Sequence, residues 1–179
     1  GKSVFSRLLR IMGYSVYDTD SEAKRLMESS LEVVQKLSEC FGRDIYHNGR
    51  LNRGLLSSRV FGKSDKIVLL NSIVHPVVRF DFYRWSESLN EEICFVESAI
   101  LYESRFDELV DEVWTVTAPE ELRISRVRQR SGLTEEEIKK RMVAQLSEEE
   151  KQRRAAHIIW NDGNVSVIHR VLSLLKSLE

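Results

Sequence analysis

Short apolar segments alternate with longer helical segments along this chain, and this alternation constrains the fold more than any other feature. Strand-like runs occur at YSVYD (14–18), ICFVES (93–98), EVWTVTA (112–118) and AHIIWNDG (156–163). Short apolar strands separated by helices are typical of a parallel sheet whose two faces are covered by helices. The sequence therefore predicts an α/β fold, and its 179 residues fit one domain.

Apolar spacing and capping signals predict the helices. Thr134, followed at the third position by Glu137, predicts a capping box. The predicted helical ranges are 3–12, 21–27, 31–41, 53–61, 64–74, 77–89, 120–129, 135–145, 148–155 and 165–178.

Turn and breaker residues separate some of these helices. Gly42 is expected to end a helix, and Asn48-Gly49 predicts a turn within an otherwise irregular segment. His75-Pro76 is predicted to end one helix before the next begins, because proline cannot donate a backbone hydrogen bond.

Parallel sheets bind ligands outside the carboxyl ends of their strands. The candidate residues are therefore those that follow each strand, namely Asp18–Asp20, Ser98–Glu103, Thr117–Ala118 and Asn161–Asp162. The first helix has no strand before it, so the pattern predicts a further strand upstream of Gly1. The lack of an initiator methionine agrees with this expectation.

Gly1-Lys2-Ser3 matches the end of the phosphate-binding pattern G-x-x-x-x-G-K-[ST]. In that loop, backbone N–H groups and a helix N-terminus hold phosphates, the lysine reaches the β- and γ-phosphates and the hydroxyl binds Mg²⁺. Three residues alone also fit an ordinary helix start. The phosphate loop is favoured because a helix begins at Ser3 and the next strand ends in a carboxylate.

Asp18 and Asp20 lie at the end of that next strand. Kinases place an aspartate there to orient or deprotonate the acceptor hydroxyl, so we predict that Asp18 is the catalytic carboxylate. The predicted N-cap of the following helix is Asp20 or Ser21. Asp20 is assigned this capping role or a contact with magnesium-bound water.

An arginine cluster occupies the helix predicted over 120–129 and its exit. Arg123, Arg126 and Arg130 are spaced for one helical face, and Arg141 follows on the next helix. Such a run is most often a solvated charged face, in part paired with nearby glutamates. The alternative is that Arg126 and Arg130, with Arg141 behind them, neutralise a transferring phosphoryl group.

Composition excludes several classes of protein. The formal net charge of −1 gives no basic field for a nucleic acid, and no apolar run approaches the ~20 residues of a membrane helix. Cys40 and Cys94 share no metal-site or redox spacing, which indicates a reducing, cytoplasmic setting.

Several segments, taken in order, resemble the dephospho-coenzyme A kinase family. GKS is similar to the end of its glycine-rich loop, and MGYSVYDTDSEAKRLM (12–27) to its acceptor-site segment with D-x-D. The most specific segment is LNRGLLSSRVFGKSDKIVLLNSIVHPVV (51–78), which has the family's L-x-R, V-F and H-P pattern. RISRVRQRSGLTEEEIKKRMVAQ (123–145) resembles its arginine-rich lid.

Two further segments resemble the family with departures. ESAILYES (97–104) is similar to the P-L-L-F-E loop, with Ala99 in place of proline, and IIWNDG (158–163) to the turn near the adenine, with Trp160 in place of a frequent aspartate. Ser131 replaces an acid that often follows the last lid arginine. These departures concern the shape of loops more than the chemistry.

The resemblance implies a fold and a reaction. The fold would be a single P-loop kinase domain with a core (1–27, 90–128 and 154–179), a helical acceptor-binding subdomain (28–89) and a lid (129–153). The reaction would be ATP-dependent phosphorylation of the ribose 3′-hydroxyl of dephospho-coenzyme A, the last step of coenzyme A synthesis, with Mg²⁺. The expected state is a cytoplasmic monomer or weak homo-oligomer that binds neither nucleic acid nor membrane.

The resemblance also implies roles for individual residues. The predicted catalytic residues are Asp18, Lys2, Arg130 and Arg126. The predicted ATP-binding residues are Gly1, Lys2, Ser3, Arg126, Arg130 and Asn161, with Ser3 also a magnesium ligand. The predicted acceptor-binding residues are Asp18, Asp20, Arg53, His75 and Leu101, although His75 equally fits a purely structural role.

Two other functions remain open from the sequence. One is another small nucleoside or nucleotide kinase, which would not need the segment from Leu51 to Pro76. The other is a P-loop module that binds nucleotide without turnover. A module of this non-catalytic kind would not need the residues suited to phosphoryl transfer, which are Lys2, Ser3, Asp18 and the lid arginines.

Overall fold

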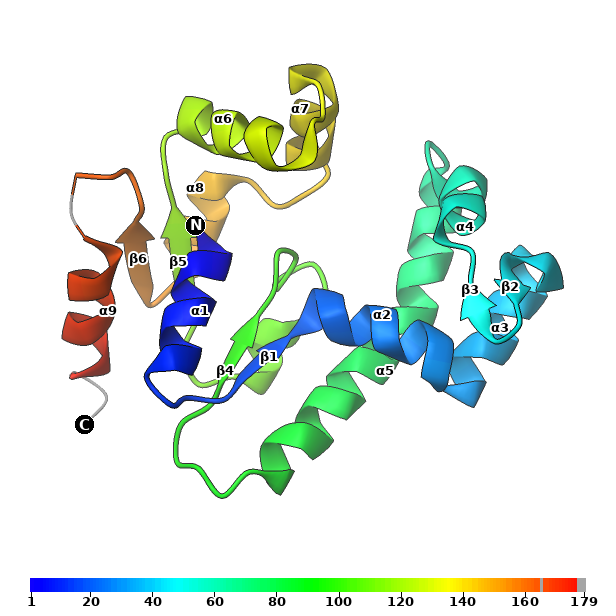
Figure 1. Cartoon of the computed structure of the whole chain (residues 1–179), viewed down its shortest axis with the longest axis horizontal. Helices are drawn as coiled ribbons and strands as arrows, with labels where there is room; N and C mark the ends of the chain where they lie inside the picture. The colour runs from blue at the N-terminus through cyan, green and yellow to red at the C-terminus, as the bar shows by residue number, and fades with distance from the viewer. Residues whose placement is uncertain (165, 177–179) are drawn as a thin grey trace. The chain divides into compact units, whose positions relative to one another are not determined.

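The structure is a computed structural model, and it describes residues 1–164 and 166–176. The chain divides into two compact units: unit 1 comprises residues 1–16 and 100–179, and unit 2 comprises residues 17–99. Helices and short strands make up both units (Figure 1), so the predicted α/β class is confirmed.

The two strands in the described part of unit 1's second segment, β5 (Trp114–Thr117) and β6 (His157–Trp160), are parallel neighbours, as the alternation predicts. In this pairing Thr117 lies opposite Trp160. The N–H of Asn161 then donates to the carbonyl oxygen of Thr117 at 2.7 Å. The pairing therefore continues to the carboxyl edge, where the candidate ligand-binding residues begin.

Two helices provide much of the apolar core of unit 1. These are α1 (Lys2–Ile11) and α9 (Val167–Leu175), and α9 lies beside β6 (Figure 1). The ring of Phe5 in α1 meets Trp114 edge-on, with centroids 6.0 Å apart. The side chains of this core that are almost completely buried include Leu9, Ile159 and Val171.

Three helices and a 3₁₀ turn complete the described part of unit 1: η2 (Phe106–Leu109), α6 (Glu120–Ser131), α7 (Glu135–Val143) and α8 (Glu148–Arg154). Gly132, at φ 68°, ends α6 in the left-handed conformation that glycine adopts without steric cost. The predicted capping box of α7 is confirmed: Glu137 N–H donates to Thr134 Oγ1 at 3.3 Å, and Thr134 N–H donates to Glu137 Oε2 at 2.8 Å.

Unit 2 is mainly helical. β1 (Val16–Asp18) pairs with β4 (Phe95–Glu97), and Thr19 Oγ1 donates to the carbonyl oxygen of Glu97 at 3.0 Å. Its helices are α2 (Thr19–Ser29), α3 (Leu31–Phe41), η1 (Arg43–Ile45), α4 (Arg53–Val60) and α5 (Ser64–Ser88). Their shared core contains Leu26, Val33, Leu37, Ile45, Leu56, Val74, Val78 and Phe82.

The segment predicted to be irregular forms a hairpin. β2 (Tyr46–His47) pairs antiparallel with β3 (Arg50–Leu51). Asn48 and Gly49 connect them with φ values of 49° and 75°. Two positive φ angles are what a two-residue hairpin turn of type I′ requires, so the Asn-Gly turn signal is confirmed, while the strands that flank it were not predicted.

The predicted break at His75-Pro76 is wrong, because α5 continues through it from Ser64 to Ser88. An internal proline costs a helix about 3 kcal/mol through its missing N–H and its ring. Burial of one large apolar side chain contributes about 1.5–3 kcal/mol, so several such side chains on one face outweigh that cost. The buried residues of α5 are Ile73, Val74, Val78 and Phe82.

The last predicted helix, 165–178, is confirmed over α9, while Val165 and Leu178 fall outside the described residues. Within residues 1–164 and 166–176, no helix has the length and apolar character needed to cross a membrane.

Candidate active site

Gly1 brings the start of α1 close to the carboxyl ends of β5 and β6. The Gly1 carbonyl oxygen accepts from Val4 N–H at 3.1 Å at the beginning of the helix. A Cβ atom at position 1 would lie 3.1 Å from Val116 Cγ1 and 3.2 Å from Asn161 Nδ2. Because both approaches are tighter than ordinary contacts, a side chain here would require the Val116 and Asn161 side chains to shift by a few tenths of an ångström. Glycine thus permits the helix N-terminus to reach this edge.

Lys2 and Ser3 occupy the first turn of α1, and both are exposed. That turn contains no acidic residue. A helix N-terminus carries a partial positive charge of about half a unit, to which Lys2 adds a full charge. This end of α1 is therefore suited to an anion such as a phosphate.

Arg126 joins α6 to the same place. Its Nη1 donates to the carbonyl oxygen of Asn161 at 2.7 Å, and its side chain is half-buried. The structure thus brings together five of the six residues predicted to bind ATP: Gly1, Lys2, Ser3, Arg126 and Asn161.

The arginines predicted to share one face of α6 have different surroundings. Arg123 Nη1 lies 2.9 Å from Glu148 Oε1, and the same carboxylate accepts from Thr117 Oγ1 at 3.0 Å. Arg123 therefore ties α6 to α8. Arg130 is exposed and forms no ion pair within the described part of the chain. Of this group, Arg130 is the cation that a ligand could recruit without breaking an existing bond.

Two further predicted residues of unit 1 lie on other elements. Arg141 is exposed on α7. The pKa of the nearby Glu137 carboxyl is lowered mainly by hydrogen bonds from Thr134 and to a smaller extent by the charge of Arg141. Leu101 is half-buried in the loop before η2, where its carbonyl oxygen accepts from Phe106 N–H at 2.9 Å.

Asp18, in unit 2, ends β1 and caps α2. Its Oδ1 accepts from the N–H groups of Asp20 at 3.0 Å and Ser21 at 3.3 Å, and its Oδ2 accepts from Ser21 Oγ at 2.9 Å. The prediction that Asp20 or Ser21 is the N-cap is therefore wrong. Asp18 takes that role because its extended backbone directly precedes Thr19, the first helical residue. These bonds fix the carboxylate, and Oδ2 keeps a lone pair for a hydroxyl donor.

The other predicted acceptor residues of unit 2 lie on three helices. Asp20 is exposed in the first turn of α2. Arg53 Nη2 at the start of α4 lies 3.0 Å from Glu28 Oε1, so this guanidinium already has a carboxylate partner. His75 is half-buried in α5, and burial lowers its pKa, which keeps the imidazole neutral at pH 7.

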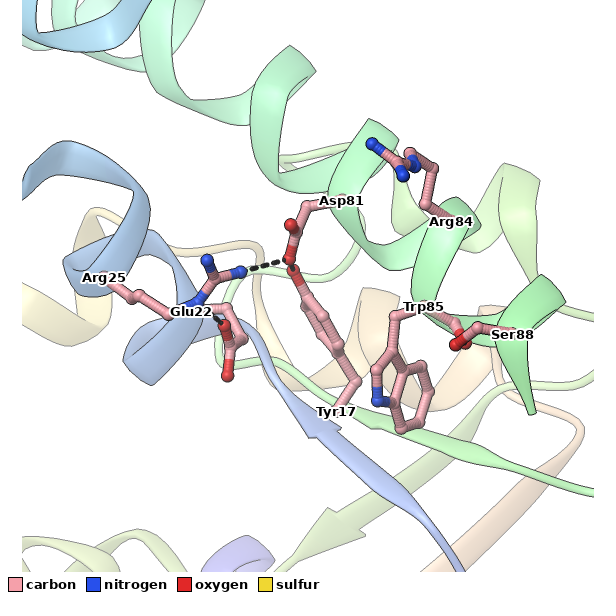
Figure 2. Close-up of a pocket in the computed structure, with 7 residues that line it drawn as sticks. All are labelled: Tyr17, Glu22, Arg25, Asp81, Arg84, Trp85 and Ser88. Atoms are coloured by element: carbon pink, nitrogen blue, oxygen red, sulfur yellow. Dashed lines mark hydrogen bonds and ion pairs between the residues drawn. The ribbon is translucent and has the colours of Figure 1, made fainter. Parts of the chain in front are cut away.

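Unit 2 also contains a pocket of about 370 Å³ that the sequence analysis missed. It is lined by Tyr17, Glu22, Arg25, Asp81, Arg84, Trp85 and Ser88 (Figure 2). The four residues from α5 have the spacing i, i+3, i+4 and i+7. That spacing puts polar and aromatic side chains on one helical face. This pattern was the feature of the sequence from which the pocket could have been predicted.

A hydrogen-bond network fixes one wall of this pocket. Asp81 Oδ2 accepts from Tyr17 Oη at 2.7 Å and from Arg25 Nη2 at 2.7 Å, and the three side chains converge in Figure 2. Arg25 Nε also donates to Glu22 Oε2 at 2.5 Å. Burial, followed by the Asp81 carboxylate, raises the pKa of Tyr17, so the phenol stays protonated.

Comparison with known proteins identifies the family. A family described as dephospho-CoA kinase matches residues 1–166. Proteins named dephospho-CoA kinase are 37% identical in Porphyromonas gingivalis and 38% identical in Bacteroides fragilis. Both alignments cover 99% of this chain, and they cover 89% and 87% of those proteins respectively.

Solved structures show the same fold. A crystal structure of a Thermus thermophilus protein is 34% identical, with a TM-score of 0.85 over 99% of this chain and 91% of that one. Dephospho-CoA kinase from Campylobacter jejuni is 24% identical, with a TM-score of 0.72 over 99% of this chain and 90% of the other, and this second likeness concerns the fold alone. The predicted resemblance is confirmed, and the chain belongs to the dephospho-CoA kinase family.

Proposed function

We propose that this protein transfers the γ-phosphoryl group of ATP to the ribose 3′-hydroxyl of dephospho-CoA, giving CoA and ADP. The observation that carries the proposal is the meeting of Gly1, Asn161 and Arg126 at the exposed N-terminus of α1. An anion-binding helix end beside a guanidinium suits a nucleotide phosphate chain. The choice of acceptor is supported by membership of the family and by the names of the similar proteins.

At the phosphate end, each residue would have a distinct role. Lys2 would contact the β- and γ-phosphates, and the N–H groups that begin α1 would donate hydrogen bonds to phosphate oxygens. Arg126 and the more exposed Arg130 would stabilise the charge of the transferring group, while Asn161 would lie against the nucleotide.

Mg²⁺ is the expected metal, and the residues present fit it. Mg²⁺ is usually held by substrate phosphates and only one or two protein oxygens, and the Ser3 hydroxyl in the first turn of α1 can provide one. Among residues 1–164 and 166–176, no cluster of three His, Cys, Asp or Glu side chains could hold a metal without such a substrate. When bound, Mg²⁺ would neutralise charge on the phosphates.

At the acceptor end, Asp18 would orient the 3′-hydroxyl and accept its proton late in the transfer. Phosphoryl transfer needs little covalent work from the protein, so positioning and electrostatics dominate. The capping bonds from Asp20 N–H and Ser21 hold the carboxylate still, which supports this role. Asp20, Arg53, His75 and Leu101 remain proposed acceptor contacts.

The proposed division into core, acceptor subdomain (28–89) and lid (129–153) follows the family pattern, as do a cytoplasmic location and a monomeric or weakly homo-oligomeric state. Lid closure would exclude water before transfer. Arg130 and Arg141 lie within the proposed lid, where closure could bring cations to the phosphates.

A comparison of the transfer rates to different acceptors tests the function. The protein would be given ATP with dephospho-CoA, adenosine, AMP or shikimate under identical conditions, and the initial rates compared. We expect the highest kcat/KM for dephospho-CoA. A higher value for another acceptor would favour a different small-molecule kinase, and ATP binding without transfer to any acceptor would favour the non-catalytic module.

A further inference from the structure

Glu148 joins three elements of unit 1 at one carboxylate. Its Oε1 lies 2.9 Å from Arg123 Nη1 on α6 and 3.5 Å from Lys151 Nζ on α8, and its Oε2 accepts from Thr117 Oγ1 at 3.0 Å. We refer to these four residues as the Glu148 clamp. Thr117 is buried, and the side chains of Arg123, Glu148 and Lys151 are 26%, 27% and 15% exposed, so solvent and salt screen these ion pairs less than pairs at the open surface.

The clamp extends to the nucleotide end of the candidate site. Thr117 ends β5, and its carbonyl oxygen accepts from Asn161 N–H at 2.7 Å. Arg126, one helical turn after Arg123, donates to the carbonyl oxygen of Asn161. Helix α6 is therefore held at two successive turns, first by the clamp and then by the Asn161 turn. Arg130 follows on the same helical face one turn later.

Arg123 is suited to hold α6 in place rather than to contact a ligand. Its Nη1 is engaged by Glu148, and its Nε is buried without a hydrogen-bond partner among the residues that the structure describes. Arg123 and Lys151 lie against the same carboxylate oxygen. Without that carboxylate, two cations would remain with no anion between them, and their repulsion would move the start of α6 away from α8.

The ion pair between Arg123 and Glu148 also joins the two ends of the proposed lid (129–153). Arg123 precedes this segment on α6, and Glu148 begins α8 near the end of the segment. The two stems of the lid are thus tied to each other at their base. Helix α7 (Glu135–Val143) lies between these stems in the sequence.

Two further hydrogen bonds hold the stem that contains α8. Lys151 Nζ donates to Gln145 Oε1 at 3.2 Å, and Leu146 N–H donates to Glu103 Oε1, in the loop before η2, at 2.6 Å. The ion pairs of α7 within the described chain, in contrast, join residues of that same helix, namely Lys139 to Glu135 and Lys140 to Glu136. This difference indicates that α8 belongs to the fixed base and that α7 is the part that can move.

We propose that Glu148 is a positioning residue for phosphoryl transfer, which acts through Arg123 and Thr117 without contacting a substrate. The clamp fixes the start of α6 and thereby places Arg126 and Arg130 at the nucleotide phosphates, while α7 is the moving part of the lid. The proposal rests on the proposed function for the roles of these last two arginines.

Steady-state kinetics of matched variants test the role of the clamp. Glu148→Gln removes the charge and keeps the size of the side chain, and Arg123→Gln removes the charge of its partner. Glu149→Gln is the control, because Glu149 is exposed in the same turn of α8 and the substitution removes the same charge outside the clamp. The kcat and the KM values for ATP and for dephospho-CoA would be measured separately.

We expect Glu148→Gln and Arg123→Gln to lower kcat by roughly 10- to 100-fold, because a misplacement of about 1 Å far from the reacting atoms can cost 10²-fold. The KM for ATP should rise, and the KM for dephospho-CoA should stay unchanged. The double variant should be no slower than the slower single variant, because both side chains act through one interaction. Arg123→Lys keeps a cation beside Glu148 and should retain most of the kcat.

Three kinetic results would overturn the proposal. They are an unchanged kcat in Glu148→Gln, an equal loss of kcat in Glu149→Gln, and losses that multiply in the double variant. The second result would mean that net charge alone causes the effect, and the third that Glu148 and Arg123 act independently.

Hydrogen–deuterium exchange tests the same division of the lid without turnover and without any substitution. The amides of α8 should exchange slowly both with and without the non-hydrolysable ATP analogue AMP-PNP, whereas those of α7 should gain protection when AMP-PNP is bound. An equal gain of protection in α7 and α8 would show that α8 moves with the lid and would overturn the proposal. If the protein transfers no phosphate to dephospho-CoA, the proposed function fails, while this exchange pattern still decides the role of the clamp.

Discussion

The guanidinium of Arg126 donates a hydrogen bond to the carbonyl oxygen of Asn161 at a distance of 2.7 Å. This bond joins α6 to the turn after β6, beside which Gly1 begins α1. The nucleotide end of the proposed site is thus partly assembled by the protein itself. Arg130, four residues further along α6, makes no such bond within residues 1–164 and 166–176, and so the two arginines should respond differently to substitution.

Arg130→Ala should lower turnover strongly with little effect on stability. A cation on the transferring phosphoryl group can contribute roughly 10³–10⁵ in rate. Because Arg130 is exposed, the free energy of unfolding should change by less than about 0.5 kcal/mol. Steady-state kinetics and urea unfolding would measure both effects. Arg128→Ala, an exposed position on the same helix, is the control, and unchanged turnover in Arg130→Ala would indicate that Arg130 belongs to an ordinary solvated face.

Asp18→Asn should reduce turnover by roughly 10²–10⁴, the usual span for general acid–base assistance, while ATP affinity stays near that of the unsubstituted protein. Asparagine caps helices about as well as aspartate, so α2 should be retained and the loss would reflect the missing charge. Rapid-quench measurement of a single turnover would report the chemical step.

Asp20→Asn is the comparison for Asp18→Asn, because Asp20 lies on the same helix turn but is exposed and does not cap it. We expect a much smaller effect. A normal rate for Asp18→Asn with a lost rate for Asp20→Asn would show that the two carboxylates have been assigned in reverse.

Features that depend on a few adjacent residues could be predicted from the sequence. The capping box of Thr134 and Glu137 and the Asn48-Gly49 turn are of this kind, because each is decided by local hydrogen bonds and backbone angles. The proximity of Gly1 to Asn161 could also be predicted, since parallel strands end at a common edge of the sheet.

Features that depend on packing between distant segments could not be predicted in this way. Pro76 was expected to break a helix, but apolar burial along α5 outweighs that local preference. The bond between Tyr17 and Asp81 joins residues 64 positions apart, so no local pattern contains it. The cap of α2 was misassigned because Asp18 was considered only as a catalytic group, although one carboxylate can serve both purposes.

The half-buried His75 should make stability depend on pH. Burial lowers its pKa below the ordinary value of 6.5 that applies in the unfolded chain. The unfolded state therefore binds more protons as the pH falls through 6.5 toward the folded pKa, and stability decreases in that direction. The contribution of this one group cannot exceed about 1.4 kcal/mol per pH unit.

Urea unfolding between pH 7.5 and 5.5 would measure the effect of His75. The loss of unfolding free energy over this range should be smaller in His75→Gln than in the unsubstituted protein. An equal loss in both proteins would assign the pH dependence to other groups.

Pro76→Ala should stabilise the protein. Pro76 is exposed within a continuous helix, where alanine is about 3 kcal/mol more favourable, and the freer unfolded chain offsets about 0.4–1 kcal/mol of that gain. We expect a net increase of about 2–2.6 kcal/mol in the free energy of unfolding by urea titration. Ser72→Ala, at another exposed position of α5, should change little, and destabilisation by Pro76→Ala would argue against a continuous α5.

The position of the transferred phosphate tests the central claim most directly. The protein would be incubated with ATP, Mg²⁺ and dephospho-CoA, and the products analysed by ³¹P nuclear magnetic resonance and mass spectrometry. The proposed function predicts a new phosphomonoester on the ribose 3′-oxygen, with one ADP formed for each product molecule. Phosphate on any other oxygen of the acceptor, or release of inorganic phosphate with dephospho-CoA unchanged, would contradict it.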